Sequence, residues 1–278
     1  MIENTFCLLP GIGAKTERRL WDAGVLTWDD LLSTAGSPVP PLARALAPDR
    51  LAEARARLEQ RDADYFAGLL PAAEQWRLYG DFGDSVAYFD IETTGLSVDE
   101  DHITCIALYD GARVRTYVYG DNLEEFADDI RDYSLMVTFN GKSFDVPVIE
   151  RQLKIRLPKA HVDLRWVLRA LGFRGGLKKC ERQIGISRDE LEGVDGYLAV
   201  LLWHEYRASG DKRALETLLA YNVADVLGLE HLLALAYNRK LEGTPFALER
   251  AIALPTPVDN PHRPDAGILA RVRGSYTG

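Results

Sequence analysis

Cysteine is scarce in this chain of 278 residues, which contains only Cys7, Cys105 and Cys180. Three isolated cysteines, with no Cys-x-x-Cys pair, argue against a disulfide framework and against a structural zinc site. The five histidines form no His-Glu-x-x-His motif, which disfavours zinc-dependent hydrolysis. We therefore expect three buried thiols.

Long apolar runs are also missing. No segment approaches the roughly 18 uninterrupted apolar residues of a membrane-spanning helix. The first residues, MIENTFCLLPG, lack the basic start and the apolar length of a signal peptide. We expect a cytoplasmic protein with no membrane partner.

Positive charge is in deficit, with 33 Lys and Arg residues against 42 Asp and Glu residues and a net charge of −9. The overall charge therefore gives no support to nucleic-acid binding, which would have to be local. Residues 151–182 hold ten basic and two acidic residues, a net charge of +8. This segment is either a surface for a polyanion or a set of solvated helix faces.

The first part of the chain has a helical pattern. Helices are expected at residues 14–23, 28–33 and 48–66, with a proline-rich break at residues 37–41. We infer a small helical domain over residues 1–76.

The pattern changes to β-branched and aromatic runs after residue 84. Strands are expected at residues 85–92, 102–109 and 112–119, with Asp110-Gly111 as a hairpin turn. An acidic helix at 123–132 and a strand at 135–139 come next. Further helices are expected at residues 146–154, 162–171, 177–184, 197–207 and 212–237.

These elements predict an α/β domain over residues 84–240. Residues 241–278 follow as a C-terminal extension rich in proline and arginine. We expect this extension to be a tail without its own core.

Acidic side chains in this domain indicate a metal site. Asp90 and Glu92 stand two residues apart at the end of the first strand, so both carboxylates point to one face. Two like charges beside apolar neighbours need a cation, and an all-oxygen pair suits Mg²⁺ or Mn²⁺. Asp145 follows the strand 135–139, and Asp225 shares a helix face with Tyr221. The alternative for Asp145 is a helix N-cap.

Three segments resemble the motifs of DEDD exonucleases, in the family's order. They are DIETTGL at residues 90–96, FNGKSFDVP at residues 139–147 and YNVAD at residues 221–225. The second is similar to that of family B polymerase proofreading domains, and GLKKCE at 176–181 resembles the YprB-type ribonuclease H-like branch. The third has tyrosine four residues before aspartate, as in the tyrosine subtype.

The resemblance implies an α/β fold with a ribonuclease H-like mixed sheet flanked by helices, and a metal-dependent 3′ to 5′ exonuclease using two divalent cations, Mg²⁺ or Mn²⁺. It implies that Asp90 bridges both ions. Glu92 and Asp225 would complete the ion that activates water, Asp145 would support the second ion, and Tyr221 would orient the water.

The resemblance also implies a binding region for the substrate, which is expected to be a single strand or a 3′ end of nucleic acid, DNA rather than RNA. Thr94, Gly95 and Leu96 would hold the terminal nucleotide. Asn140, Lys142 and Phe144 would lie near the strand.

The segment LPGIG at residues 9–13 resembles the hairpin of a helix-hairpin-helix motif, which implies a small all-α nucleic-acid-binding domain before the α/β domain. Gly11 and Gly13 would allow a tight turn whose amides bind a phosphate, assisted by Lys15, Arg18 and Arg19. The alternative is a helical hairpin used only for packing.

Two other functions compete with the exonuclease. The first is a non-catalytic nucleic-acid-binding or adaptor protein with a vestigial site. The second is an aspartyl phosphatase with Asp90 as nucleophile, although that motif needs aspartate where Glu92 stands. A base formed by His161 and Asp163 is disfavoured, because two positions apart the side chains rarely meet in the needed geometry.

Overall fold

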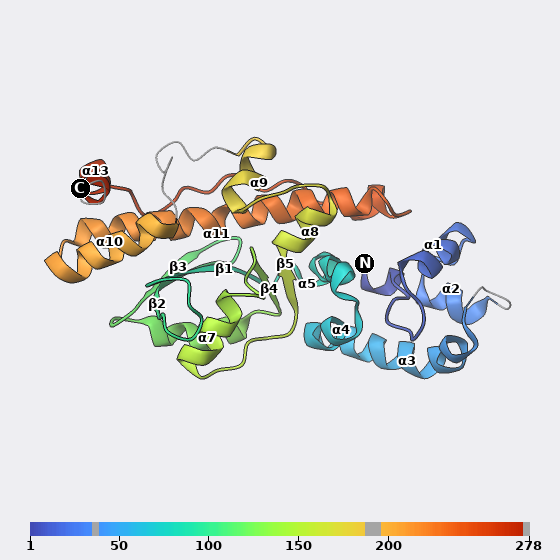
Figure 1. Cartoon of the computed structure of the whole chain (residues 1–278). Coiled ribbons are helices and arrows are strands. Elements are labelled where there is room, and N and C mark those ends of the chain that lie inside the picture. The colour runs from blue at the N-terminus through green and yellow to red at the C-terminus, as the bar shows by residue number, and fades with distance from the viewer. Residues whose placement is uncertain (35–38, 187–195, 275–278) are drawn as a thin grey trace.

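The structure is a computed structural model that describes residues 1–34, 39–186 and 196–274 (Figure 1). It consists of a helical N-terminal part, a five-stranded sheet between helices, and a C-terminal segment that returns along the longest helix. All three cysteines are buried and free, as the sequence predicted.

The N-terminal part contains more helices than the sequence predicted. The helix expected at 48–66 is two helices, because Arg61 adopts a left-handed conformation (φ 57°) and Asp62 caps a new helix by accepting from the Tyr65 amide. The first of these begins at Pro41, where a missing N–H costs nothing, and continues through Pro48. Ser37 and Pro38 of the expected break lie outside the described residues. The elements are η1 (Ile2–Asn4), α1 (Ala14–Asp22), α2 (Trp28–Ser33), α3 (Pro41–Glu59), α4 (Ala63–Leu69), η2 (Ala72–Leu78) and α5 (Tyr79–Phe82).

The sheet has the order β3-β2-β1-β4-β5. Strands β1 (Val86–Thr93), β2 (Ile103–Tyr109) and β3 (Val114–Val118) form the predicted antiparallel meander, and β4 (Leu135–Thr138) pairs with β1 in parallel. The predicted α/β fold with a mixed sheet is confirmed.

One strand was missed. The helix expected at 162–171 is a short strand, β5 (His161–Asp163), followed by α8 (Leu164–Ala170). Three residues are too few to show the alternation that marks a strand. Asp163 ends the strand and caps α8 by accepting from the Arg165 amide.

The remaining helices pack on the sheet or on the helices that cover it. The acidic helix expected at 123–132 is three short turns, and the last helix of the α/β part runs four residues further than expected, to Leu241. The elements are η3 (Leu123–Glu125), α6 (Phe126–Asp129), η4 (Ile130–Asp132), α7 (Asp145–Leu153), α9 (Leu177–Gln183), α10 (Gly196–Ser209), α11 (Lys212–Leu241), α12 (Ala247–Arg250) and α13 (Ala266–Gly274).

The two faces of the sheet pack against different helices. Phe89 and Ile91 of β1 are buried with α6 and α7, whereas Tyr88 lies in the cluster that includes α11. The latter cluster continues without a break into the N-terminal helices, through Phe66 and Trp28. Residues 1–76 and 84–240 thus share buried contacts, and their division into two domains stays a prediction.

Helix α11 is long and apolar enough, by length and composition, to cross a membrane, which alone is weak evidence for such a role. In the described residues, 67% of its apolar window is buried inside the protein. It packs against β1 and β2, so its apolar surface belongs to the core of this fold.

The C-terminal segment runs back along α11. Asn260 Nδ2 donates to the Ala220 carbonyl (2.7 Å), and the Asp265 amide donates to Thr217 Oγ1 (2.9 Å). Helix α13 then buries Ile268 and Leu269 in a cluster shared with α10 and α11. The tail predicted to lack its own core therefore packs on the core of the preceding domain.

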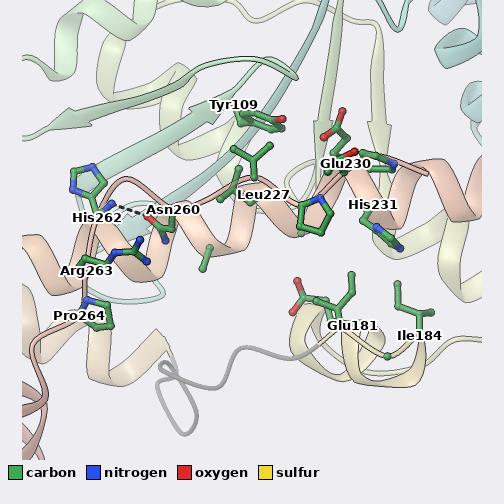
Figure 2. Close-up of a pocket in the computed structure, with 18 residues that line it drawn as sticks. Tyr109, Glu181, Ile184, Leu227, Glu230, His231, Asn260, His262, Arg263 and Pro264 are labelled. Atoms are coloured by element: carbon green, nitrogen blue, oxygen red, sulfur yellow. Dashed lines mark hydrogen bonds between the residues drawn. The ribbon is translucent and has the colours of Figure 1, made fainter. Parts of the chain in front are cut away.

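A cavity of about 670 Å³ lies between this segment, α9 and α11 (Figure 2). Leu227, Pro257 and Ile184 give it apolar walls, and His262 lies at one end, where its amide donates to Asn260 Oδ1. None of the four predicted metal-binding acids lines this cavity.

Candidate active site

Three of the four predicted acids meet where β1 faces α11. Asp90, Glu92 and Asp225 each offer one carboxylate oxygen, and these atoms lie within 4.8 Å of one another. Asp90 and Glu92 point to the same face because they alternate with Phe89 and Ile91, which are buried on the other face. The β1–β2 pairing becomes irregular between Glu92 and Thr93, at the end of this acidic stretch.

Glu92 is a buried acid of the cluster. Its side chain is 9% exposed. Burial, and then the nearby charge of Asp225, raise the pKa of Glu92 well above its usual range, while Lys178 partly offsets this. A buried carboxylate group of this kind is most stable with a bound cation.

Asp145, the fourth predicted acid, lies at the start of α7, near enough to Glu92 and Asp225 to interact with them electrostatically. It is the first residue of α7 and not its N-cap, which is Phe144, so the alternative role as a cap is wrong. Pairing with β4 ends at Tyr88, and the Ile91 amide further along β1 bonds the Asp145 carboxylate. Burial raises the pKa of Asp145 to about 7, although hydrogen bonds from backbone amides act to lower it. Its Oδ1 atom is buried without a hydrogen-bond partner.

The loop that carries Asp145 is fixed by β4 and β5. Asp163 accepts from the amides of Asn140 (2.8 Å) and Lys142 (3.2 Å), and Thr138 Oγ1 accepts from the Gly141 amide (3.1 Å). Asn140 adopts a left-handed conformation, φ 71°. Asp163 is thus a positioning residue for the loop.

His161 and Asp163 do not form a catalytic pair. His161 Nε2 lies 2.8 Å from Thr138 Oγ1, and the Asp163 carboxylate is occupied by backbone amides. The disfavoured interpretation of these two residues as a base and its partner is therefore excluded by their contacts.

Tyr221 lies one turn before Asp225 on α11 and contacts a lysine that the predicted site did not include. Lys178 Nζ donates to Tyr221 Oη at 2.8 Å and sits 4.1 Å from the centre of its ring. Lys178 belongs to the basic segment 151–182, but nothing in its sequence position relative to Tyr221 predicted that the two side chains would meet.

Asn222 was also missed. Its Nδ2 donates to Asp90 Oδ2 at 2.9 Å, and its Oδ1 lies 3.7 Å from Cys105 Sγ. Asn222 is fully buried. It holds the Asp90 carboxylate in one orientation, and its place inside the YNVAD motif was the one available signal.

The segment predicted to hold a terminal nucleotide forms a loop stabilised by Asp101. Asp101 accepts from Thr94 Oγ1 (2.8 Å) and from the Ser97 amide (2.7 Å). A Cβ atom on Gly95 would lie 2.5 Å from Asp101 Oδ2, so a larger residue there would have to displace the Asp101 carboxylate. Leu96 is 89% exposed. Leu96 therefore offers an apolar surface to a ligand.

The residues predicted to lie near the strand begin the same loop as Asp145. Asn140 Oδ1 accepts from Arg165 Nη1 at 2.5 Å. Lys142 Nζ donates to Gln75 Oε1 of η2 at 2.6 Å. Phe144 packs in the cluster on the α7 face of the sheet.

The N-terminal hairpin lies apart from the carboxylates. Gly11 has φ 77° and Gly13 is the N-cap of α1, which carries Lys15. In the described residues 1–8 the element before the hairpin is the three-residue η1, and the helix-hairpin-helix motif is not confirmed. Figure 1 shows α1 at the end of the molecule opposite α10, away from the junction of β1 and α11.

The donor set of the site fits a divalent cation. All donors are carboxylate oxygens, the ligands that Mg²⁺ and Mn²⁺ prefer. The raised pKa of Glu92 and the unpartnered Oδ1 of Asp145 both indicate negative charge that the protein itself does not fully compensate. A buried acidic triad on this fold suggests divalent metal use.

Residues 87–237, just over half of the chain, match the model of the RNase H superfamily. The chain belongs to the RNase H superfamily. The match spans the sheet and the helix that carries Asp225.

Two further comparisons found similar proteins. The uncharacterized protein YprB of Bacillus subtilis is 30% identical over 175 residues, covering 52% of this chain and 40% of that protein. The chain therefore matches less than half the length of YprB. The family B DNA polymerase from the hyperthermophilic archaeon Pyrobaculum calidifontis is similar with a TM-score of 0.45 and 18% identity, covering 60% of this chain and 27% of that one.

Proposed function

We propose that this protein is a metal-dependent exonuclease that shortens nucleic acid from the 3′ end. The observation that carries this proposal is the convergence of Asp90, Glu92 and Asp225 within 4.8 Å on a ribonuclease H-like sheet. In this proposal the protein is cytoplasmic, and DNA is preferred over RNA.

Asp90, Glu92, Asp225 and Asp145 would hold two divalent cations, Mg²⁺ or Mn²⁺, which supply an activated water and stabilise negative charge at the phosphate. The fit is supported by the all-oxygen donor set and by the unpartnered Asp145 Oδ1. Without cations, four carboxylates would repel a polyanionic substrate.

The other side chains have roles that follow from their positions. The Tyr221 hydroxyl, one helical turn before Asp225, orients the attacking water by hydrogen bonding. Lys178 fixes that hydroxyl at 2.8 Å and brings a positive charge toward Glu92. Thr94, Gly95 and exposed Leu96 contact the terminal nucleotide.

The N-terminal hairpin is proposed as a second, weaker contact with the phosphate backbone through Gly11, Gly13 and Lys15. Lys15 and the amides near it lie at the start of α1, where a helix favours an anion.

Hydrolysis of 5′-labelled single-stranded DNA and RNA of matched sequence tests the proposal. With Mg²⁺ or Mn²⁺ the wild type should give a ladder that shortens from the 3′ end. Asp90→Asn should abolish the ladder while leaving the folded structure intact. Asp99→Asn, an exposed acid on the neighbouring loop, is the matched control and should cleave like the wild type.

Intact substrate with the wild type would overturn the exonuclease. A gel shift without cleavage would then support the non-catalytic adaptor, and a phosphoenzyme trapped on Asp90 would support the aspartyl phosphatase.

A further inference from the structure

A second cavity, of about 510 Å³, shares elements with the candidate active site. It lies between the end of β4, helix α8 and helix α9. Asn140, one of its lining residues, begins the loop that leads to Asp145. Helix α9 lines the cavity with Leu177 and Cys180 and carries Lys178 to Tyr221. The cavity and the candidate active site thus share the loop after β4 and helix α9.

Three arginines line this cavity, which we call the arginine cavity: Arg165, Arg169 and Arg174. All three are exposed, and in the described parts of the chain none forms an ion pair with an acid. Arg165 bonds the neutral amide of Asn140. Many arginines elsewhere, such as Arg77 and Arg271, are paired with carboxylates. Three uncompensated guanidinium groups around one cavity favour an anionic ligand.

Aromatic surfaces accompany this charge. Phe139 and Phe173 line the cavity and are partly buried. Trp166 of α8 is 48% exposed, and the guanidinium groups of Arg165 and Arg169 lie 5.7 Å and 5.6 Å from its ring. Alternating guanidinium groups and accessible aromatic rings bind unpaired bases and their phosphates, whereas a duplex keeps the faces of its bases covered.

We propose that the arginine cavity binds the single-stranded part of the substrate, a few nucleotides upstream of the end that is cleaved. The proposal rests on the proposed function, because it takes the carboxylates as the place where the strand ends. Arg165, Arg169 and Arg174 contact phosphates, and Trp166 stacks on a base. A chain of net charge −9 thereby gains a local surface for a polyanion.

The test is the binding of a 5′-fluorescein-labelled deoxythymidine decamer, measured by anisotropy in Ca²⁺ at several salt concentrations. The triple variant Arg165→Ala, Arg169→Ala, Arg174→Ala should bind at least about tenfold more weakly than the wild type. The slope of the logarithm of the association constant against the logarithm of the salt concentration should become smaller in magnitude by about 2, because three phosphate contacts are lost. Trp166→Leu should weaken binding about fivefold or more.

The matched control is Arg113→Ala, Arg131→Ala, Arg156→Ala, which removes the same charge from exposed positions outside the cavity. It should bind like the wild type. Equal affinity and equal salt dependence of the two triple variants would overturn the proposal. Equal weakening for a blunt duplex, or tight arginine-dependent binding of thymidine monophosphate with no dependence on strand length, would also overturn it.

Hydrolysis of a dinucleotide, which lacks the upstream nucleotides assigned to the cavity, separates this proposal from the proposed function. The cavity triple variant should hydrolyse it as the wild type does. A decamer left intact by the wild type in Mn²⁺, together with arginine-dependent binding of the same decamer, would overturn the nuclease proposal but would support the assignment of the cavity.

Discussion

At the scale of the residue, His161 is a neutral side chain enclosed by the protein. It is 4% exposed, and burial lowers the pKa of His161 to about 3. In the unfolded chain the imidazole titrates near pH 6.5. Between these values the unfolded chain binds a proton that the folded chain excludes, so the free energy of unfolding decreases as the pH falls, by about 1.4 kcal/mol per pH unit.

His161→Gln should therefore make stability less dependent on pH between about 6.5 and 4. The measurement is urea unfolding at pH 7, 6, 5 and 4, with His204→Gln as a control at an exposed histidine of α10. The control should lose stability with falling pH as the wild type does. Parallel losses in the wild type and in His161→Gln would show that His161 is not the group responsible.

At the scale of the element, the loop between β4 and α7 aims Asp145 and depends on one glycine. A Cβ atom on Gly141 would collide with the Thr138 side chain. That side chain cannot move freely, because Thr138 Oγ1 is bonded to both His161 Nε2 and the Gly141 amide. The loop therefore has little room to adapt.

Gly141→Ala should displace Asp145 and reduce hydrolysis by at least about tenfold, as loss of support for metal ligands commonly does. Gly68→Ala is the matched control, since a Cβ atom there meets nothing within 4 Å. Initial cleavage rates and thermal unfolding would be measured for both. A Gly141→Ala protein that cleaves at the wild-type rate would contradict the role given to the loop.

The elements that could be predicted from sequence are those with long or regular patterns. The meander β1 to β3 and the three acidic motifs lie in continuous segments, where alternation and spacing are visible. Strand β5 was missed because three residues carry no periodicity. Lys178 and Asn222 were missed because their partners, Tyr221 and Asp90, lie 43 and 132 residues away, and only the folded chain brings them together.

At the scale of the whole molecule, a buried ion pair holds the first helix of the chain against the segment that leads into the sheet. Arg77 of η2 lies 2.7 Å from Glu17 of α1, and both are almost fully buried. Glu17 also accepts from Thr5 Oγ1 (2.6 Å) and from the Phe6 amide (2.8 Å). The ion pair thus fixes α1 against η2, while the contacts with the α/β part are the apolar ones.

Glu17→Ala should destabilise the protein by about 3 kcal/mol, because buried Arg77 then keeps only Glu74 as an acidic partner and the Thr5 hydroxyl and Phe6 amide lose their acceptor. The double variant Glu17→Met, Arg77→Met should cost less than this single change. Chemical denaturation of the wild type, both single methionine variants and the double variant gives the coupling energy between the two positions. Additive losses would show that the pair does not act as a unit.

The central claim concerns the whole molecule: a ribonuclease H-like fold brings distant acids together to cleave a phosphodiester bond with divalent metal. Hydrolysis of a strand with one phosphorothioate at the 3′-terminal linkage tests it most directly, since sulfur binds Mg²⁺ poorly and Mn²⁺ better. The account predicts that sulfur slows cleavage in Mg²⁺ and that Mn²⁺ restores it. The same slowing in both ions, or cleavage that persists without any divalent metal, would contradict the account.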